Sequence, residues 1–184
     1  MAIGNVSLQK ISFKEWRKHC GVVMQEGYIF SDTIANNIAP NADVIDKDRL
    51  LYAVEMANIK EFIESLPLRY NTRIGSTGQG LSQGQKQRIL IARAIYRNPD
   101  YLFFDEATNA LDTDNEKKIQ ENLNLFFKDK TVVVVAHRLS TVRNADQIVV
   151  LKNGVITERG THDSLIVEQG DYYRLVKNQL ELNA

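Results

Sequence analysis

Residues 81–112 read LSQGQKQRILIARAIYRNPDYLFFDEATNALD and combine a polar turn, an amphipathic helix, a proline and a short apolar strand that ends in two carboxylates. Ser82 is followed three residues later by Gln85, the spacing of a capping box, in which a hydroxyl and an amide satisfy free backbone donors at a helix start. The spacing predicts a helix that begins at Gln83. Its first turn carries no side-chain charge and includes Gly84, which lets another group approach the backbone closely. Such a helix start is a ready site for an anion.

A short apolar strand is predicted after this helix. The pair Asn98-Pro99 stops the helix, because proline cannot continue it. Tyr101–Phe104 then reads as a strand buried on both faces, and two carboxylates follow directly, where ligands collect in an open α/β sheet. Adjacent carboxylates there can divide the work of phosphoryl transfer. Asp105 would hold Mg²⁺, directly or through water, and Glu106 would polarise an attacking water.

These segments resemble the motifs of ATP-binding cassette (ABC) proteins. LSQGQ at 81–85 looks like the signature motif of that family, YLFFDE at 101–106 like its Walker B strand, and NALD at 109–112 like its D-loop. The resemblance implies an α/β fold with a P-loop NTPase-like parallel sheet flanked by helices, incomplete here, and an inserted ABC helical subdomain. It also implies ATP and Mg²⁺ as cofactors. The residues implied to contact the nucleotide are Ser82, Gln83, Gly84, Gln85 and Asp112.

The order of the motifs assigns two further residues. Gln25 follows the predicted strand Gly21–Met24 and matches the Q-loop residue, whose implied role is to reach toward Mg²⁺ and the attacking water. His137 ends a predicted buried strand, Thr131–Ala136, and matches the switch histidine, whose implied role is to donate a hydrogen bond to the γ-phosphate. Outside this context, such a glutamine is usually a solvated loop residue and such a histidine is usually structural. The resemblance thus gives the catalytic set Glu106, His137 and Gln25, and the metal ligands Asp105 and Gln25.

The family's phosphate loop is not among these motifs. No G-x-x-x-x-G-K-[ST] pattern occurs in the 184 residues, although the family places that loop upstream of the Q-loop. We therefore expect residue 1 to begin after the phosphate loop and its helix. The aromatic residue that stacks on adenine is expected further upstream still.

The resemblance divides the chain into three parts. Residues 1–25 form the strand region up to the Q-loop, with Ile3–Leu8 predicted as a strand. Residues 26–98 form the helical subdomain with the signature helix, and apolar residues at near-helical spacing from Asp48 to Leu66 indicate its core face. Residues 99–184 hold the Walker B strand, the D-loop, the switch histidine and C-terminal helices.

Local patterns outline the rest of the chain. Residues 71–78, NTRIGSTG, lie where exporter-type relatives carry T-x-[VI]-G-E-x-G, and Ser76 stands in place of the usual acid. The turn signal Asn153-Gly154 predicts a hairpin, and either Thr161 or Asp163 caps a short helix after it. The remaining predicted elements are a helix over Asp114–Phe127, strands over Asp146–Leu151 and Val155–Glu158, and a helix over Tyr172–Leu182.

Composition limits the class of partner and the location. The chain is 43% hydrophobic and 25% charged, ordinary for one soluble domain, and it has 23 basic and 23 acidic residues, so nothing favours a nucleic acid partner. The single Cys20 excludes an internal disulfide, and the longest apolar runs are too short to span a bilayer. We expect a cytoplasmic chain without a signal peptide, held at the inner face of the plasma membrane by a transmembrane domain.

Two classes of function remain open. The chain resembles ABC ATPases of the exporter type, and the glutamine in LSQGQ and the wording NALD resemble bacterial peptide or bacteriocin exporters. The first class is the ATP-hydrolysing subunit or domain of such an exporter, here a piece expected not to hydrolyse ATP alone. The second is a non-catalytic, truncated cassette that acts as an interaction module. The implied partners are a second cassette, in a head-to-tail dimer, and the transmembrane domain of an exporter.

Overall fold

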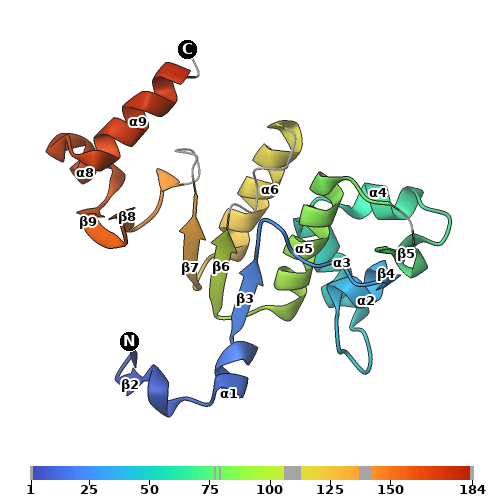
Figure 1. Ribbon diagram of the computed structural model, residues 1–184. Coiled ribbons are helices and arrows are strands. Elements are labelled where there is room, and N and C mark those ends of the chain that lie inside the picture. Colours follow the sequence, from blue (N-terminus) through green and yellow to red (C-terminus); the bar gives the residue numbers. More distant parts are fainter. Residues whose placement is uncertain (1, 77, 79, 106–112, 137–141, 183–184) are drawn as a thin grey trace. The chain divides into compact units, whose positions relative to one another are not determined.

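A computed structural model of the chain describes residues 2–76, 78, 80–105, 113–136 and 142–182 (Figure 1). The chain divides into two compact units, Met1–Val133 (the first unit) and Val134–Ala184 (the second unit). Helix α5 (Gln83–Arg97) runs through the first unit, where the capping box predicts it. It ends at Asn98, which adopts a left-handed conformation just before Pro99, so both predicted ends of this helix are confirmed.

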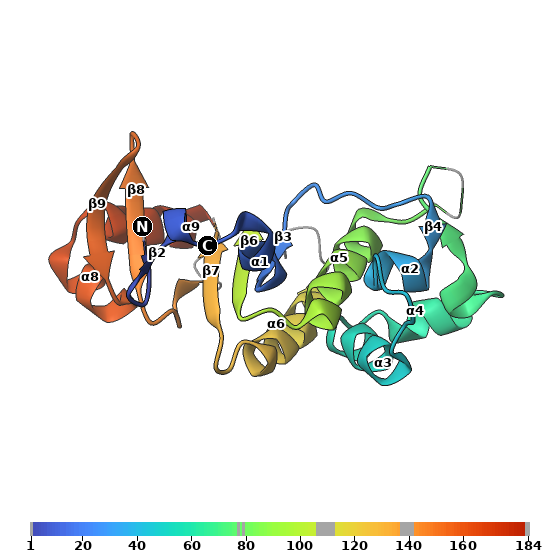
Figure 2. The same cartoon turned by 90° about the horizontal axis from the view of Figure 1, so that it is seen from below.

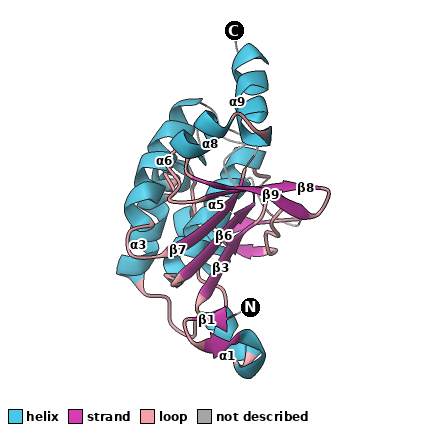
Figure 3. Ribbon diagram, turned by 90° about the vertical axis from the view of Figure 1, so that its left-hand side faces the viewer, coloured by secondary structure: helices cyan, strands magenta, loops and turns pink. Residues whose placement is uncertain are grey.

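Beside α5 lies a sheet with the strand order β3 (Cys20–Val23), β6 (Tyr101–Asp105) and β7 (Thr131–Val135) (Figure 3). Strands β3 and β6 run parallel, with Cys20 opposite Tyr101 and Val23 opposite Phe104. Helix α6 (Thr113–Phe126) connects β6 to β7, and the boundary between the two units falls within β7. The parallel pair and its flanking helices confirm the predicted α/β class.

One face of this sheet is buried and the other is partly exposed, so the prediction of strands buried on both faces is wrong. Leu102 and Phe104 of β6 are buried, but Phe103 between them is 37% exposed, and Val22 of β3 and Val133 of β7 are 58% and 47% exposed. The ring of Phe104 meets that of Phe127, next to α6, with centroids 5.2 Å apart. On this face Trp16 of the segment before β3 contacts Tyr101, with ring centroids 4.7 Å apart, but Val22, Phe103 and Val133 remain partly open to solvent.

Short helices lie beside α5 in the first unit, and the first two of them pack directly on it (Figure 2). They are α2 (Ile34–Ile38), α3 (Lys47–Met56) and α4 (Lys60–Ser65), with the turn η2 (Arg69–Asn71) and the paired strands β4 (Asp32–Thr33) and β5 (Arg73–Ile74) beside them. The apolar stripe predicted over 48–66 spans two helices, because Asn58 between them has a φ of 51°, which ends α3. Ile59 and Ile63 lie in the core, whereas Leu51 is exposed.

The N-terminal residues differ from the prediction. Instead of one strand over Ile3–Leu8, the chain forms a small antiparallel hairpin of β1 (Ala2–Ile3) and β2 (Val6–Ser7). The cause is Gly4, whose φ of 54° reverses the chain. The turn η1 (Leu8–Lys10) and helix α1 (Phe13–Lys18) follow, and His19 Nδ1 lies 2.6 Å from Asp100 Oδ2.

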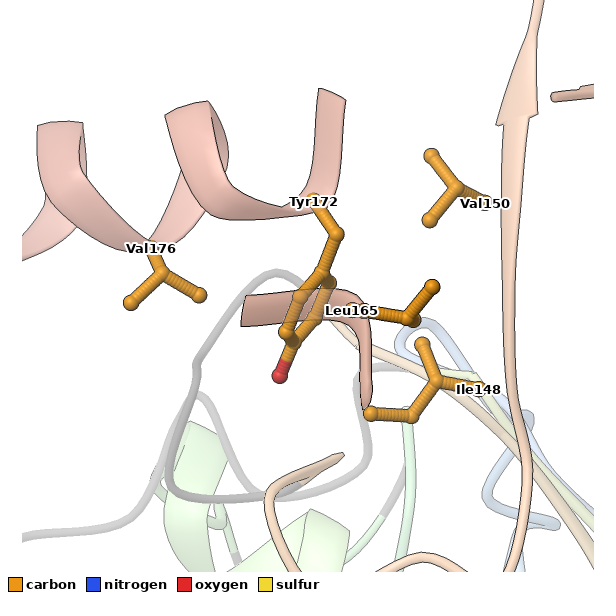
Figure 4. Close-up of a cluster of buried hydrophobic side chains, with 5 residues drawn as sticks. All are labelled: Ile148, Val150, Leu165, Tyr172 and Val176. Atoms are coloured by element: carbon orange, nitrogen blue, oxygen red, sulfur yellow. The ribbon is translucent and has the colours of Figure 1, made fainter. Parts of the chain in front are cut away.

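The second unit is a hairpin with two helices. Strands β8 (Ile148–Lys152) and β9 (Val155–Gly160) pair antiparallel across a turn at Asn153 and Gly154, both with positive φ, which confirms the predicted hairpin. Thr161, rather than Asp163, caps helix α8 (His162–Glu168), and helix α9 (Asp171–Leu182) follows. The small core of this unit consists of Ile148, Val150, Leu165, Tyr172 and Val176 (Figure 4).

Candidate functional site

The start of α5 has the geometry of a capping box. The Ser82 Oγ accepts a hydrogen bond from the Gln85 N–H at 3.2 Å, and the Ser82 N–H donates to Gln85 Oε1 at 2.9 Å. No described residue accepts from the backbone N–H of Gln83 or Gly84, and the first turn contains no acid. The cap therefore uses the N–H of Gln85 and leaves two donors directed along the helix axis. These two donors can meet an anion.

The carboxyl ends of β3 and β6 bring two predicted site residues to one edge. Because Val23 lies opposite Phe104 in a parallel pair, Asp105 and the residues just after Val23 emerge at the same edge of the sheet. Gln25 is the second residue after Val23, and the side chains of Gln25 and Asp105 are both exposed. The predicted metal ligands thus follow neighbouring strands, although they lie about 80 residues apart in the sequence.

This edge suits a cation that is also bound by phosphate oxygens. Among the residues that the structure describes, no group of three His, Cys, Asp or Glu side chains could hold a metal. One carboxylate and one amide oxygen are a small ligand set, but Mg²⁺ commonly keeps several waters and binds one or two carboxylates together with substrate phosphates. Asp105 and Gln25 fit that mode of binding, which depends on the nucleotide.

Helix α5 also contacts the segment that follows β3. We name residues 24–37 the linking segment. Gln87, one turn beyond the helix start, is 2% exposed, and its Nε2 donates to the carbonyl oxygen of Met24 at 3.4 Å. The sequence analysis did not single out Gln87, because a glutamine in an amphipathic helix is usually on the solvent face.

A second buried contact was also missed. The Arg93 guanidinium donates from Nε to Asn37 O at 2.7 Å, from Nη1 to Tyr28 O at 2.9 Å and from Nη2 to Asn37 Oδ1 at 3.1 Å. It also lies over the Phe30 ring, 4.9 Å from the centroid, and burial lowers the pKa of this arginine. The sequence did hold a signal for this contact, because Arg93 lies within the apolar run ILIARAI and a charge in such a run needs a buried partner.

Asn37 completes this contact. Its side chain is fully buried, its Oδ1 accepts from the Phe30 N–H at 2.8 Å, and its Nδ2 donates to Phe30 O at 2.9 Å and to Thr33 O at 3.0 Å. Asn37 therefore closes the linking segment on itself and presents two oxygens to the arginine of α5.

Ser76, the residue in place of the usual acid, makes a neutral contact. Its Oγ lies 2.8 Å from the Oγ of Ser31, and the Arg73 Nη2 donates to the Ser31 carbonyl at 3.3 Å. This loop is thus joined to the linking segment without an ion pair at Ser76.

Three predicted site residues lie outside the described residues. They are Glu106, Asp112 and His137, and their roles stay predictions. No helix within the described ranges is long and apolar enough to cross a membrane.

The fold and the geometry together define an α/β protein with two separate candidate contacts for a nucleotide, an open helix start at α5 and a carboxylate at the end of β6. The family model described as "ABC transporter" matches residues 1–109. The chain therefore belongs to the ABC transporter family. It corresponds to the ATP-binding domain of exporters in that family.

Individual relatives agree with this assignment. An ATP-dependent lipid A-core flippase of Haemophilus influenzae (strain 86-028NP) is 46% identical over 178 residues, which are 96% of this chain and 30% of the flippase. ABC transporter B family member 13 of Arabidopsis thaliana is 46% identical over 172 residues, 94% of this chain and 14% of that protein. The chain thus spans less than a third of the length of these relatives.

A solved structure confirms the fold. The structure of a bacterial Atm1-family ABC exporter with ATP bound has 37% sequence identity and a TM-score of 0.89, over 95% of this chain and 30% of that chain. The predicted ABC fold, with a parallel sheet flanked by helices, is therefore correct.

Proposed function

We propose that this chain performs the ATP-binding and ATP-hydrolysing work of an ABC exporter, together with a phosphate loop that its 184 residues do not contain. The observation that carries the proposal is the register of β3 and β6, which brings Gln25 and Asp105 to one edge of the sheet. Without a phosphate loop, the chain alone would not position the β- and γ-phosphates, on which phosphoryl transfer depends almost wholly. The 184 residues alone would therefore be inactive.

Each residue at the sheet edge has a role in this proposal. Asp105 and Gln25 would bind Mg²⁺ through side-chain oxygens, and the ion would neutralise charge on the phosphates. Glu106 would polarise the attacking water. His137 would donate a hydrogen bond to a γ-phosphate oxygen and so orient that water.

The start of α5 would serve a second cassette. In a head-to-tail pair, the N–H groups of Gln83 and Gly84 and the hydroxyl of Ser82 would meet a γ-phosphate held by the partner, near Gln85 and the D-loop residue Asp112. The N–H groups of Gln83 and Gly84, which have no acceptor among the described residues, and the absence of acid in the first helical turn support this role. A transmembrane domain, the other proposed partner, would hold the chain at the cytoplasmic face of the plasma membrane.

The motifs and the relatives favour different classes of transported substrate. The wording of the signature and D-loop favours a peptide or bacteriocin exporter, while the relatives include a lipid A-core flippase and, in Caenorhabditis elegans, multidrug resistance protein pgp-1. Since these relatives share similar cassettes, the 184 residues support an exporter and do not select its substrate.

A non-catalytic interaction module is the second candidate. The observation that favours it is the open apolar face of Val22, Phe103 and Val133, a surface that another chain could cover. In that case Glu106 and His137 would take no part in catalysis. Only the start of α5 would bind a nucleotide, held by the partner.

A chimera separates the two functions. The chain is joined to the phosphate-loop segment of the lipid A-core flippase, and Mg-dependent ATP turnover is compared with that of the chain alone and of a Glu106→Gln chimera. We expect turnover only in the first chimera, because only it has both the phosphate cradle and the carboxylate. A folded chimera that binds ATP but does not hydrolyse it would contradict the proposal of an ATP-hydrolysing domain and support the non-catalytic interaction module.

A further inference from the structure

Three side chains on one face of α5 contact the linking segment. Gln87, Leu90 and Arg93 are spaced three residues apart and therefore line one side of the helix. Gln87 holds the carbonyl of Met24, as described above. Leu90 lies so close to Gly27 that a Cβ on that glycine would be 2.3 Å from Leu90 Cδ1. A larger residue at position 27 would have to displace the end of the Leu90 side chain, so the backbone of the segment lies directly against the helix.

Arg93 provides the third and strongest contact. Its guanidinium binds the Tyr28 carbonyl and both oxygens of Asn37, so one side chain joins the two ends of the run 28–37. The fork of five N–H donors on arginine allows this geometry, whereas the ammonium of lysine is a single point charge. The linking segment is thus attached to α5 by three successive side chains.

Gln25 lies inside this attached region. It and Glu26 are the two residues between Met24, held by Gln87, and Gly27, packed on Leu90. The side chain of Gln25 is exposed and free to reach a ligand, while the backbone is held on both sides. A displacement of the helix would therefore displace Gln25 as well.

We propose that Gln87, Leu90 and Arg93 are positioning residues that make the linking segment move with α5, so that the start of this helix and Gln25 respond together to a ligand at either place. The link to ATP rests on the proposed function, in which the start of α5 contacts a nucleotide and Gln25 contacts the metal. The mechanical attachment itself needs no nucleotide.

Amide hydrogen exchange on the full 184-residue chain tests the attachment. Arg93→Lys is compared with Arg49→Lys, a matched control, because Arg49 also donates to a carbonyl, Tyr96 O at 2.6 Å, and lies over an aromatic ring, yet has no described contact with the linking segment. We expect Arg93→Lys to speed exchange in peptides covering 28–37 by about tenfold or more, since the Phe30 N–H depends on Asn37. Exchange in α3 should not change.

The control separates this attachment from general stability. Arg49→Lys should leave the linking segment as slow as in the parent chain. Equal acceleration in both variants, uniform acceleration across the first unit, or no acceleration in Arg93→Lys would each overturn the proposal. If Arg93→Lys does not fold, Gln87→Met gives the same comparison at residues 24–28. Because the measurement uses no ATP, its failure would leave the proposed function intact, and an inactive chimera would leave the attachment intact.

Discussion

The two ends of α5 are built in opposite ways. At the start, Ser82 and Gln85 cap each other, but the N–H groups of Gln83 and Gly84 have no acceptor among the described residues. No acid stands in the first turn, although a carboxylate there would stabilise the helix dipole by about 0.3–1 kcal/mol. This end is left open and uncharged at some cost in stability.

The other end is closed by hydrogen bonds. Asn98 adopts the left-handed conformation that closes a helix, and its N–H donates to Ile95 O. Lys130 Nζ donates to Asn98 Oδ1 at 2.8 Å and to Pro99 O at 3.0 Å, placing a positive charge where the dipole is negative. A cavity of about 310 Å³ lies beside this end, bordered by Arg49 and Lys130, and none of the predicted site residues lines it.

The difference indicates which end serves function. The closed end combines a left-handed cap with basic side chains near the last turn, whereas the open end keeps only the cap that defines the start. A residue that improves stability at the open end should therefore damage ligand binding. Changes at the two ends should separate stability from binding.

Gly84→Asp should have the largest effect. A carboxylate in the first turn interacts favourably with the positive end of the helix dipole, so the free energy of unfolding should stay equal or rise by up to about 1 kcal/mol. The same charge repels phosphate and blocks the N–H donors, and each charge-assisted contact is worth roughly 1.5–3 kcal/mol. ATP-dependent pairing with an intact ABC cassette should weaken about tenfold or more, measured by analytical ultracentrifugation.

The control for this charge is Asn124→Asp, on the exposed face of α6. It makes a comparable change in charge away from the helix start and should leave pairing unchanged. Equal pairing by the Gly84→Asp chain and the parent chain would show that the start of α5 does not contact the partner's nucleotide.

Lys130→Met addresses the closed end. The methionine keeps most of the apolar side chain but removes the hydrogen bonds to Asn98 and Pro99 and the charge over the Phe126 ring, so the free energy of unfolding should fall by about 1–2 kcal/mol in urea titrations. Lys128→Met, at an exposed position two residues earlier, should change it by less than about 0.5 kcal/mol. ATP-dependent pairing should survive both changes, and its loss in Lys130→Met alone would contradict the separation of the two ends.

Local rules predicted both ends of α5 from the sequence. The cap is encoded within four residues, Ser82 to Gln85, and the stop within the pair Asn98-Pro99. The order of motifs likewise predicted that Gln25 and Asp105 follow strands of one sheet, which the register of β3 and β6 bears out. Features of this kind depend on short patterns, and short patterns can be read directly.

Long-range features could not be predicted in the same way. The contact of Arg93 with Asn37 joins residues 56 positions apart, and no local pattern around either residue identifies the other as its partner. The open face at Phe103 was missed because a run of apolar residues reads the same whether one face or both are covered. The break between α3 and α4 was missed because the apolar spacing continues past Asn58, which ends α3 in a left-handed conformation.

Ser82 offers the smallest and most discriminating change. Ser82→Ala removes the acceptor for the Gln85 N–H, so the free energy of unfolding should fall by about 1 kcal/mol and pairing should weaken as well. Ser82→Asn restores a capping oxygen, so stability should return to within a few tenths of a kcal/mol of the parent value. Pairing should stay weak in Ser82→Asn, because the bulkier amide occupies the space where the hydroxyl would meet phosphate. Urea titrations and ATP-dependent sedimentation of the same two proteins supply both readings. Recovery of pairing together with stability in Ser82→Asn would mean that Ser82 acts only as a cap, and the contact with the partner's phosphate would then rest on the N–H groups of Gln83 and Gly84 alone.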